Sequence, residues 1–326
     1  MKMESCLVCG NDEFKVKRLL PGLSIRICTI CGFIVSQVKK TKVVTAEFSR
    51  INESAYHQAV GGVRQLQAAE ILSFVKAHGR DAKVWLDIGC SFGYLLSEAR
   101  AAGYNVFGIE PDEKALSHAR GVLGNEIVQQ GFFGESTAPD GFDIVSMLDV
   151  LEHIKPRELP DLAQMIYRKL RNDGFWVIKV PTTDGLYFKL AHRLLPISRS
   201  ISSPFIKRLW QSEYQYPHTV YFNESTIKLF LQNQGFELIA TKYLQEVPNG
   251  MIVNRLLMDD TIPKWQALFS APVFLLINLI EKARQKSDAL LVLAKKVESA
   301  LGPSDFSDGK FYRENYVRIK YWPFGG

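Results

Sequence analysis

The stretch from Val84 to Leu96 constrains the fold of this chain more than any other. An apolar run ends in the pattern Asp87-x-Gly89-x-x-x-Gly93 and leads into a helical pattern, which predicts a strand, a tight turn and a helix. Glycine at 89 and 93 lets the backbone turn without a Cβ clash and lets a ligand lie against it. The amide groups at the start of the new helix can then face a polar or anionic group of that ligand.

A second predicted strand, residues 105–110, ends in the carboxylate of Glu110. A carboxylate at the C-terminal end of such a strand can accept hydrogen bonds from a pair of ribose hydroxyls. Together the two strands predict a site for a nucleotide-like ligand.

Strand and helix patterns alternate along the middle of the chain. Further strands are predicted at 127–128, 142–148, 174–180 and 236–243, and helices at 63–77, at 95–102, from Asp112 onward, at 156–170 and at 223–234. This alternation predicts an α/β fold with a doubly wound, mostly parallel sheet that binds its ligand at the C-terminal edge of the strands. We expect residues 262–301 to be helical and residues 312–322 to form the last strand of the sheet.

Four of the five cysteines form two Cys-x-x-Cys pairs, Cys6 with Cys9 and Cys28 with Cys31. Each pair can place two thiolates on one knuckle, and two knuckles give tetrahedral zinc coordination. A thioredoxin-like redox pair would need only one such motif, in a βαβ context. We therefore predict a small N-terminal zinc ribbon whose Zn²⁺ is structural, since four thiolates leave no coordination position open for catalysis.

The predicted organisation has four parts. They are a zinc-binding module at 1–40, a connector at 41–62, a ligand-binding core at 63–250, and a C-terminal helical insertion with the last strand at 251–326. Within the core, an insertion at 184–222 breaks the pattern: from Asp184 to Glu213 five basic residues occur with no carboxylate between. The insertion is either a helical segment with a solvated basic face, or a lid that favours an anionic or amphiphilic substrate.

Charge and hydropathy limit the possible partners and location. A formal net charge of +6 permits anionic partners without requiring them. No apolar signal region follows Met1, so we expect a cytoplasmic protein. The apolar run from Ala267 to Ile280 contains Pro272 and is shorter than the about 20 residues of a transmembrane helix. We expect it to be buried, with a peripheral membrane contact as the alternative.

Three features together resemble the class I S-adenosylmethionine-dependent methyltransferases. They are the pattern Asp87-x-Gly89-x-x-x-Gly93, the acid at Glu110, and the run Ser-Met-Leu-Asp-Val-Leu-Glu-His-Ile at 146–154. The resemblance covers about residues 63–245, and the last run is similar to that of the ubiquinone-biosynthesis-like O-methyltransferases. Cys-x-x-Cys pairs ahead of such a domain resemble the sugar C-methyltransferases of polysaccharide and natural-product pathways.

The resemblance implies a Rossmann-like sheet of seven strands and S-adenosylmethionine as cofactor. The residues that it implies at the cofactor are Gly89, Cys90 and Gly93 at the methionine part, Asp87 at the amino group, Glu110 at the ribose hydroxyls, Pro111, Asp112 and Phe132 at the adenine, and Leu148 and Asp149 near the methionine moiety. Because the position of Cys90 varies among small residues in this family, its thiol need not be functional.

Two histidines are candidates for a general base. Methyl transfer from a sulfonium needs alignment and, for some acceptors, removal of a proton. His153, just past the fourth strand, and His218, ahead of the helix at 223–234, could each take a proton from a hydroxyl or an acidic carbon. Either could instead order a loop, and Tyr216 and Tyr221 could shape the pocket.

These features predict a methyltransferase that acts on a small, anionic acceptor such as a nucleotide sugar, a glycan or a lipid-linked intermediate. A nicotinamide-dependent oxidoreductase would need Gly-x-Gly-x-x-Gly, which the Asp87 pattern does not provide. An RNA methyltransferase or nucleic-acid-binding protein that uses the zinc module as a reader is the alternative. Only the net charge of +6 supports it, so we expect no nucleic-acid partner.

Overall fold

The computed structural model describes residues 5–39, 61–79, 81–133, 140–213, 216–253 and 264–297. The strand expected at 312–322 and most of the connector expected at 41–62 lie outside the described residues.

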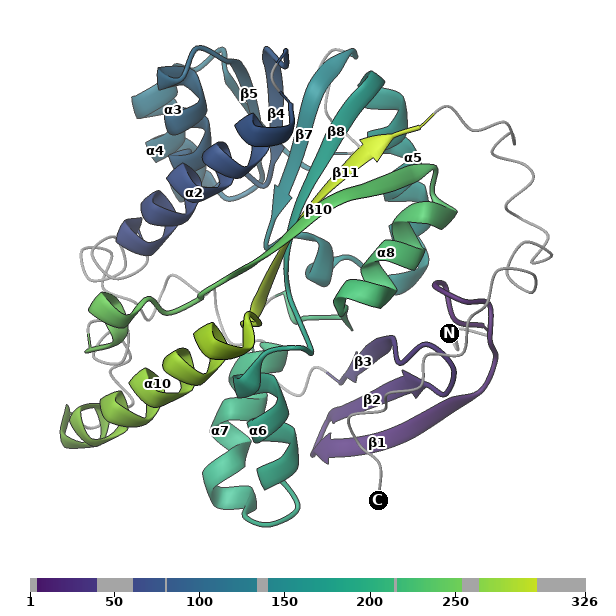
Figure 1. Ribbon diagram of the computed structural model, residues 1–326, viewed down its shortest axis with the longest axis vertical. Coiled ribbons are helices and arrows are strands. Elements are labelled where there is room, and N and C mark those ends of the chain that lie inside the picture. Colours follow the sequence, from purple (N-terminus) through teal and green to yellow (C-terminus); the bar gives the residue numbers. More distant parts are fainter. Residues whose placement is uncertain are drawn as a thin grey trace.

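Seven strands form the central sheet in the order β10-β11-β8-β7-β4-β5-β6 (Figure 1). Their bounds are β4 (Val84–Ile88), β5 (Asn105–Glu110), β6 (Val128–Gln130), β7 (Phe142–Leu148), β8 (Leu170–Pro181), β10 (Phe236–Leu244) and β11 (Ala289–Lys296). All neighbouring strands from β6 to β8 are parallel, whereas β11 runs antiparallel to both β8 and β10. The predicted doubly wound, mostly parallel sheet is therefore confirmed. Its strand order reverses between β4 and β7, the point at which such sheets bind their ligands.

Helices cover both faces of the sheet (Figure 1). One face carries α2 (Gly62–His78), α3 (Tyr94–Ala101) and α4 (Glu113–Leu123); the other carries α5 (Leu159–Lys169) and α8 (Glu224–Asn233). Apolar residues at helical spacing direct this packing: Ile71 and Val75 of α2 pack with Trp85 of β4 on the first face. On the second face Ile166 of α5 packs with Trp176 of β8.

The prediction of a continuous helix at 262–301 is wrong. In the described part of that range, helix α10 (Lys264–Arg284) is followed by strand β11 at 289–296, which lies between β8 and β10. All side chains from Ala289 to Ala294 are buried, so the strand has a continuous apolar sequence in place of an alternating one. Periodicity cannot distinguish such a run from a buried helix.

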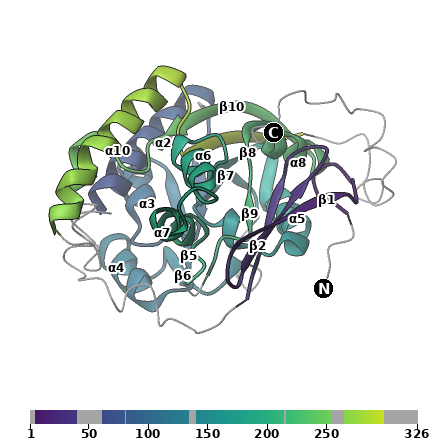
Figure 2. The same ribbon diagram turned by 90° about the horizontal axis from the view of Figure 1, so that it is seen from below.

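The N-terminal module is a small antiparallel sheet that incorporates part of the insertion. Its strands β1 (Phe14–Leu20), β2 (Leu23–Cys28) and β3 (Ile34–Val38) are followed in the sheet by β9 (Val220–Tyr221). The insertion also contains α6 (Leu186–Leu194) and α7 (Arg199–Trp210), whose Phe188 and Trp210 share a core with Leu19, Ile25 and Ile34 of the small sheet. In both views α6 and α7 lie between this sheet and α10 (Figure 1 and Figure 2).

Short 3₁₀ turns complete the described chain: η4 (Leu151–His153), η5 (Pro156–Glu158) and η6 (Asn249–Met251). Within the described ranges, no helix has the length and apolar character that crossing a bilayer requires.

Candidate functional site

The turn between β4 and α3 has the predicted glycine geometry. Gly89 and Gly93 adopt φ of 74° and 81°, in the left-handed region that side chains disfavour. A Cβ on Gly89 would also lie 2.6 Å from Cγ2 of Val150, so the turn approaches the chain that follows β7. The residues after β4 and β7 thus meet at the strand-order reversal.

Glu110 ends β5 beside this turn, and its side chain is 7% exposed. Its two carboxylate oxygens accept hydrogen bonds from the backbone amides of Ser91, at 2.7 Å, and Asp112, at 2.8 Å. Burial raises the pKa of Glu110, while these two amide donors oppose that rise. Each oxygen has a second lone pair, so the fixed carboxylate can accept two further hydrogen bonds from a diol.

Asp87 lies under the turn in strand β4. Its carboxylate accepts a hydrogen bond of 2.6 Å from the Ser146 hydroxyl, which in turn accepts one of 2.8 Å from the Trp85 indole. Burial raises the pKa of Asp87 to about 7, and the nearby charge of Glu110 adds to the rise. A cationic group beside Asp87 would favour its carboxylate form.

The remaining residues implied for the nucleoside differ in their surroundings. Asp112 caps α4 by accepting hydrogen bonds from the first-turn amides, so its carboxylate stabilises the helix start. Pro111 is exposed and Phe132 is 55% exposed. The Cys90 sulfur is buried and lies 2.8 Å from the place of a Cβ on Gly108, so it packs against β5. Contacts of these residues with a cofactor stay predictions.

An ion-pair network surrounds the end of β7. Leu148 is half-buried, and Asp149 has φ of 56° and pairs with both Arg64 and Lys179, the latter at 2.9 Å. Lys179 is fully buried in β8 and also pairs with Glu246 at 2.5 Å. Although burial opposes ionisation, the charges of Arg64 and Lys179 hold the pKa of Asp149 at about 2. Sequence reasoning missed Arg64 and Lys179. The sequence feature that could have indicated Lys179 is the presence of a lysine within the apolar run 175–180.

The structure brings the two candidate histidines together. The rings of His153 and His218 are 4.9 Å apart between centroids. His218 is 7% exposed, with Nδ1 3.2 Å from the Tyr221 hydroxyl oxygen. Because that hydroxyl donates to the Leu209 carbonyl at 2.5 Å, His218 must donate its Nδ1–H to Tyr221, which leaves the lone pair on Nε2. Tyr216 is 52% exposed.

Electrostatics keeps this pair neutral. Burial lowers the pKa of His218 to about 3 and also lowers that of His153. Burial raises the pKa of the adjacent Glu152 well above its usual range. Among the described residues, neither Glu152 Oε2 nor His153 Nδ1 has a hydrogen-bond partner.

The side chains of Glu152, His153 and His218 could either bind a metal ion or accept a proton from a substrate. Glu152, His153 and His218 each offer a ligand atom within 4.8 Å of the others. One carboxylate and two imidazoles are suitable ligands for a divalent transition metal. The same neutral imidazoles could accept a proton from a bound substrate.

The N-terminal module holds the segment that carries His218. The Ser36 amide donates to the Thr219 carbonyl at 2.8 Å, and the Ser36 hydroxyl donates to the His218 carbonyl at 2.6 Å. On its other side, the Thr219 amide donates to the Glu152 carbonyl at 2.6 Å. The small sheet, the insertion and the turn after β7 therefore meet at the histidine pair.

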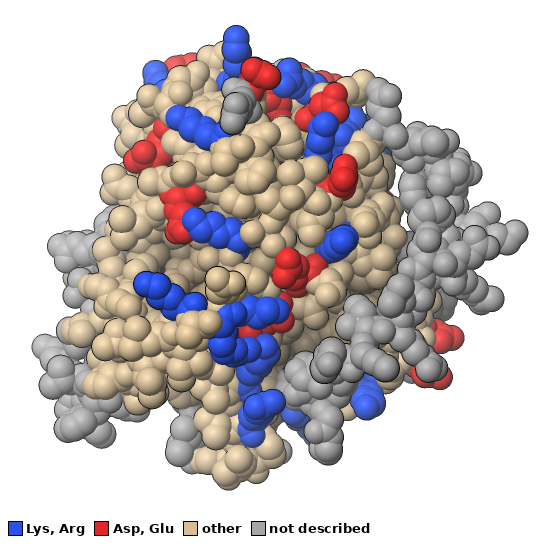
Figure 3. All heavy atoms as spheres, viewed as in Figure 1, with Lys and Arg blue, Asp and Glu red and all other residues tan. Residues whose placement is uncertain are grey.

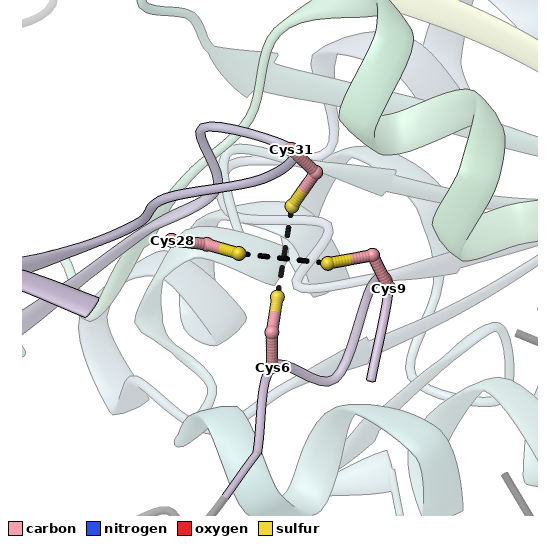
Figure 4. A group of neighbouring side chains, drawn as sticks. All are labelled: Cys6, Cys9, Cys28 and Cys31. Carbon is pink, nitrogen blue, oxygen red and sulfur yellow. Dashed lines mark hydrogen bonds between the residues drawn. The ribbon is translucent and has the colours of Figure 1, made fainter. Parts of the chain in front are cut away.

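The four predicted metal ligands form one cluster. Their sulfur atoms point to a common centre in Figure 4, with 3.6 Å between those of Cys6 and Cys31 and 3.5 Å between those of Cys9 and Cys28. Four thiolates placed tetrahedrally about 2.3 Å from a zinc ion would have their sulfurs about 3.8 Å apart. All four residues are buried. The cluster is thus compatible with zinc in donor type, number and spacing.

The backbone around the cluster forms the two expected knuckles. The Gly10 amide donates to the Cys6 carbonyl at 2.7 Å, and the Gly32 amide donates to the Cys28 carbonyl at 3.1 Å. Both glycines have positive φ, 72° and 78°. Each turn therefore aims its two sulfurs to the same side.

Comparison with known proteins assigns the family. A methyltransferase domain model matches residues 62–241, which include the glycine turn, Glu110 and the strands β6, β7 and β8. The chain belongs to the class I S-adenosylmethionine-dependent methyltransferases. This methyltransferase shares its fold with a chain from the structure of a Haloferax volcanii methyltransferase in complex with the Trm112 activator. The TM-score is 0.51 and the identity 13%, over 76% of this chain and 96% of that chain.

Two curated proteins are similar in sequence to this methyltransferase. Ubiquinone biosynthesis O-methyltransferase of Nitrosomonas europaea is 33% identical over 107 residues, 30% of this chain and 43% of the relative. The enzyme of the same name from Thiobacillus denitrificans is 34% identical over 100 residues, 28% of this chain and 41% of the relative. The methyltransferase therefore matches less than half of the length of these relatives.

Proposed function

We propose that this protein transfers the methyl group of S-adenosylmethionine to a hydroxyl group of a small, anionic acceptor. The observation that carries the proposal is the Glu110 carboxylate, fixed by two backbone amides beside the glycine turn at the strand-order reversal. That arrangement suits a ligand with a free ribose diol.

The proposed binding of the methyl donor rests on residues at the C-terminal ends of β4, β5 and β7. Glu110 would accept hydrogen bonds from the two ribose hydroxyls, and Asp87 would accept one from the amino group of the methionine part, directly or through water. Gly89 and Gly93 would let that part lie against the backbone. Bound S-adenosylmethionine supplies an activated methyl group, so the protein's contribution is alignment and proton removal.

The proposed removal of the acceptor's proton rests on the pair formed by His153 and His218. A hydroxyl must lose its proton as the new bond to carbon forms, and a neutral imidazole with a free lone pair can take it. Nε2 of His218 is available for this role because Nδ1 is committed to Tyr221. Burial keeps the ring neutral but also weakens it as a base, and the negative charge of a bound anionic acceptor would raise its pKa again. Similarity to two O-methyltransferases over the shared segment supports transfer to oxygen.

The proposed charge of the acceptor rests on the insertion. Lys189 and Arg193 of α6 lie in a segment without acids before Glu213, and Lys207 of α7 pairs with Glu213 at 2.6 Å. An anionic acceptor such as a nucleotide sugar, a glycan or a lipid-linked intermediate would be attracted to this part of the molecule.

The four-cysteine cluster is proposed to hold a structural zinc ion. Its sulfurs have the number and spacing that zinc requires, and four thiolates close the coordination sphere. The module then acts by holding the His218 segment in place.

The proposal is tested by methyl transfer from isotopically labelled S-adenosylmethionine to a panel of anionic hydroxyl compounds. His218→Ala should lower kcat by about 10²-fold or more, with S-adenosylhomocysteine affinity unchanged. The matched control is His78→Ala, at an exposed histidine that ends α2. Unchanged kcat of His218→Ala at saturating acceptor would show that His218 is not the general base. Activity lost to a chelator and restored by a divalent cation, with the four-cysteine zinc retained, would mean that the histidine pair binds a metal instead.

A further inference from the structure

Helix α10 has one buried and one exposed face, and the exposed face is apolar. The expectation that the run from Ala267 to Ile280 is buried is therefore wrong for one side of the helix. Phe274 and Ile277 lie on the buried side, with Asn278 and Glu281. The exposed side carries five large apolar residues: Val273 (56% exposed), Leu275 (42%), Leu276 (57%), Leu279 (52%) and Ile280 (39%). At 100° per residue these five fall within one arc of the helix, opposite the buried side. We call them the apolar face.

Polar contacts on the buried side fix the rotation of α10. The Asn278 amide group donates to the Val247 carbonyl at 2.8 Å. The Glu281 carboxylate accepts a hydrogen bond of 2.7 Å from the Leu186 amide at the start of α6. Turning the apolar face inward would break both bonds. The apolar face is therefore a fixed feature of the surface.

A basic cluster adjoins this face where α10 meets α6. Burial lowers the pKa of Lys189, and the positive charges of Arg284, Lys286 and Arg193 lower it further against the opposing charge of Asp184. The charges of Arg284, Lys286 and Arg193 therefore lie near Lys189, and Lys286 pairs with Asp184 at 3.5 Å. Figure 3 shows blue side chains gathered at this end of α10, beside its tan surface. An anionic partner would relieve the repulsion.

We propose that α10 lies on the surface of an anionic phospholipid bilayer. The apolar face would enter the boundary between headgroups and acyl chains, and the basic cluster would contact lipid phosphates. A helix with a wide apolar face, bordered by Lys282 and Arg284, has the composition of an interfacial helix. The proposal goes beyond the methyltransferase activity and does not rest on it.

Charge favours a lipid surface over a second copy of this chain. A two-fold contact between apolar faces would place the same surface patch of both copies together. A parallel pair of α10 helices would bring the two basic clusters together, whereas an anionic bilayer supplies the opposite charge to each cluster.

The test uses the full chain with sedimenting vesicles of phosphatidylcholine, with or without phosphatidylglycerol. The wild type should bind the mixed vesicles and should bind pure phosphatidylcholine at least about tenfold more weakly. Leu276→Asp combined with Leu279→Asp should lose binding to both. Arg193→Glu combined with Arg284→Glu should lower binding to the mixed vesicles by about tenfold or more and remove most of its salt dependence.

Matched controls place the same changes elsewhere on the surface. Val16→Asp with Val122→Asp alters two apolar residues that are 69% and 54% exposed, and Lys76→Glu with Lys114→Glu reverses two exposed charges. Both controls should bind as the wild type does, and all variants should keep the wild-type circular dichroism spectrum. No wild-type binding to mixed vesicles, or equal loss in variants and controls, would overturn the proposal. So would a dimer that the Leu276→Asp, Leu279→Asp variant dissociates while vesicles bind neither protein.

Discussion

Removing the Ser36 hydroxyl of the N-terminal module should lower both the stability of the protein and its kcat, although Ser36 is not part of the turn between β4 and α3. Ser36→Ala deletes the 2.6 Å hydrogen bond to the His218 carbonyl and leaves the Thr219 contact in place. The net value of such a bond is about 1 kcal/mol, and a poorly solvated carbonyl left without its donor costs about 1–3 kcal/mol. Because Ser36 is half-buried, we expect a loss of about 1–2 kcal/mol in the free energy of unfolding.

Two assays separate this effect from general damage. At about 2–4 °C per kcal/mol, the melting temperature should fall by roughly 2–8 °C. A displaced His218 should also lower kcat, by up to about 10²-fold for a shift near 1 Å. S-adenosylhomocysteine affinity should stay within about twofold of wild type, since the altered contact is not part of the donor loop.

Ser36→Thr provides the control, because threonine keeps the hydroxyl and is well tolerated in a strand. It should recover most of the lost kcat. A Ser36→Ala variant with wild-type kcat, or one whose S-adenosylhomocysteine affinity falls as much as its kcat, would refute the coupling between module and histidine.

Three further predictions follow from single contacts. Metal analysis of the purified chain should find one zinc per molecule, and Cys28→Ser should lose that zinc together with at least about 3 kcal/mol of stability. Burial holds the pKa of His192 at about 4, so the folded state resists a proton that the unfolded chain accepts from about pH 6.5 downward. Wild type should therefore lose about 2 kcal/mol between pH 7 and pH 5 that His192→Gln does not lose, measured by urea unfolding; equal slopes would contradict this. Lys179→Met leaves Asp149 and Glu246 without their buried partner and should cost about 3–5 kcal/mol, whereas a change below 1 kcal/mol would show that water replaces the lysine.

Local signals explain why the central sheet could be predicted from the sequence. The strand at 105–110 begins and ends as expected, and helix α8 starts within one residue of the predicted position, where Asn223 and Thr226 form a reciprocal capping box. Glycine spacing likewise predicted the turn after β4, because a positive φ at Gly89 is a requirement that the sequence must meet locally.

Features that depend on distant partners could not be predicted in this way. The apolar run at 289–294 becomes a strand only because β8 and β10 lie on either side of it. Strand β9 has two residues, too few for any periodic signal, and exists because β3 offers it a free edge. Lys179 is a strand residue by pattern, and its role emerges only when Asp149 and Glu246 are brought to it.

The histidine pair was predictable in part from local sequence and in part only from the fold. The sequence indicated His153 and His218 separately, each with a loop-ordering alternative. Folding places their rings 4.9 Å apart, buries His218 and half-buries His153, which neither local pattern contained. The prediction that one of them serves as a base is still to be tested by substitution.

The central claim is that Glu110 and the glycine turn hold S-adenosylmethionine, and titration calorimetry with S-adenosylhomocysteine tests it most directly. We predict one site per chain with a Kd below about 1 mM, weakened about 10- to 100-fold by Glu110→Gln through the loss of hydrogen bonds to a charged acceptor. The absence of binding by the folded wild-type protein at millimolar ligand, or equal affinity in Glu110→Gln, would contradict the account.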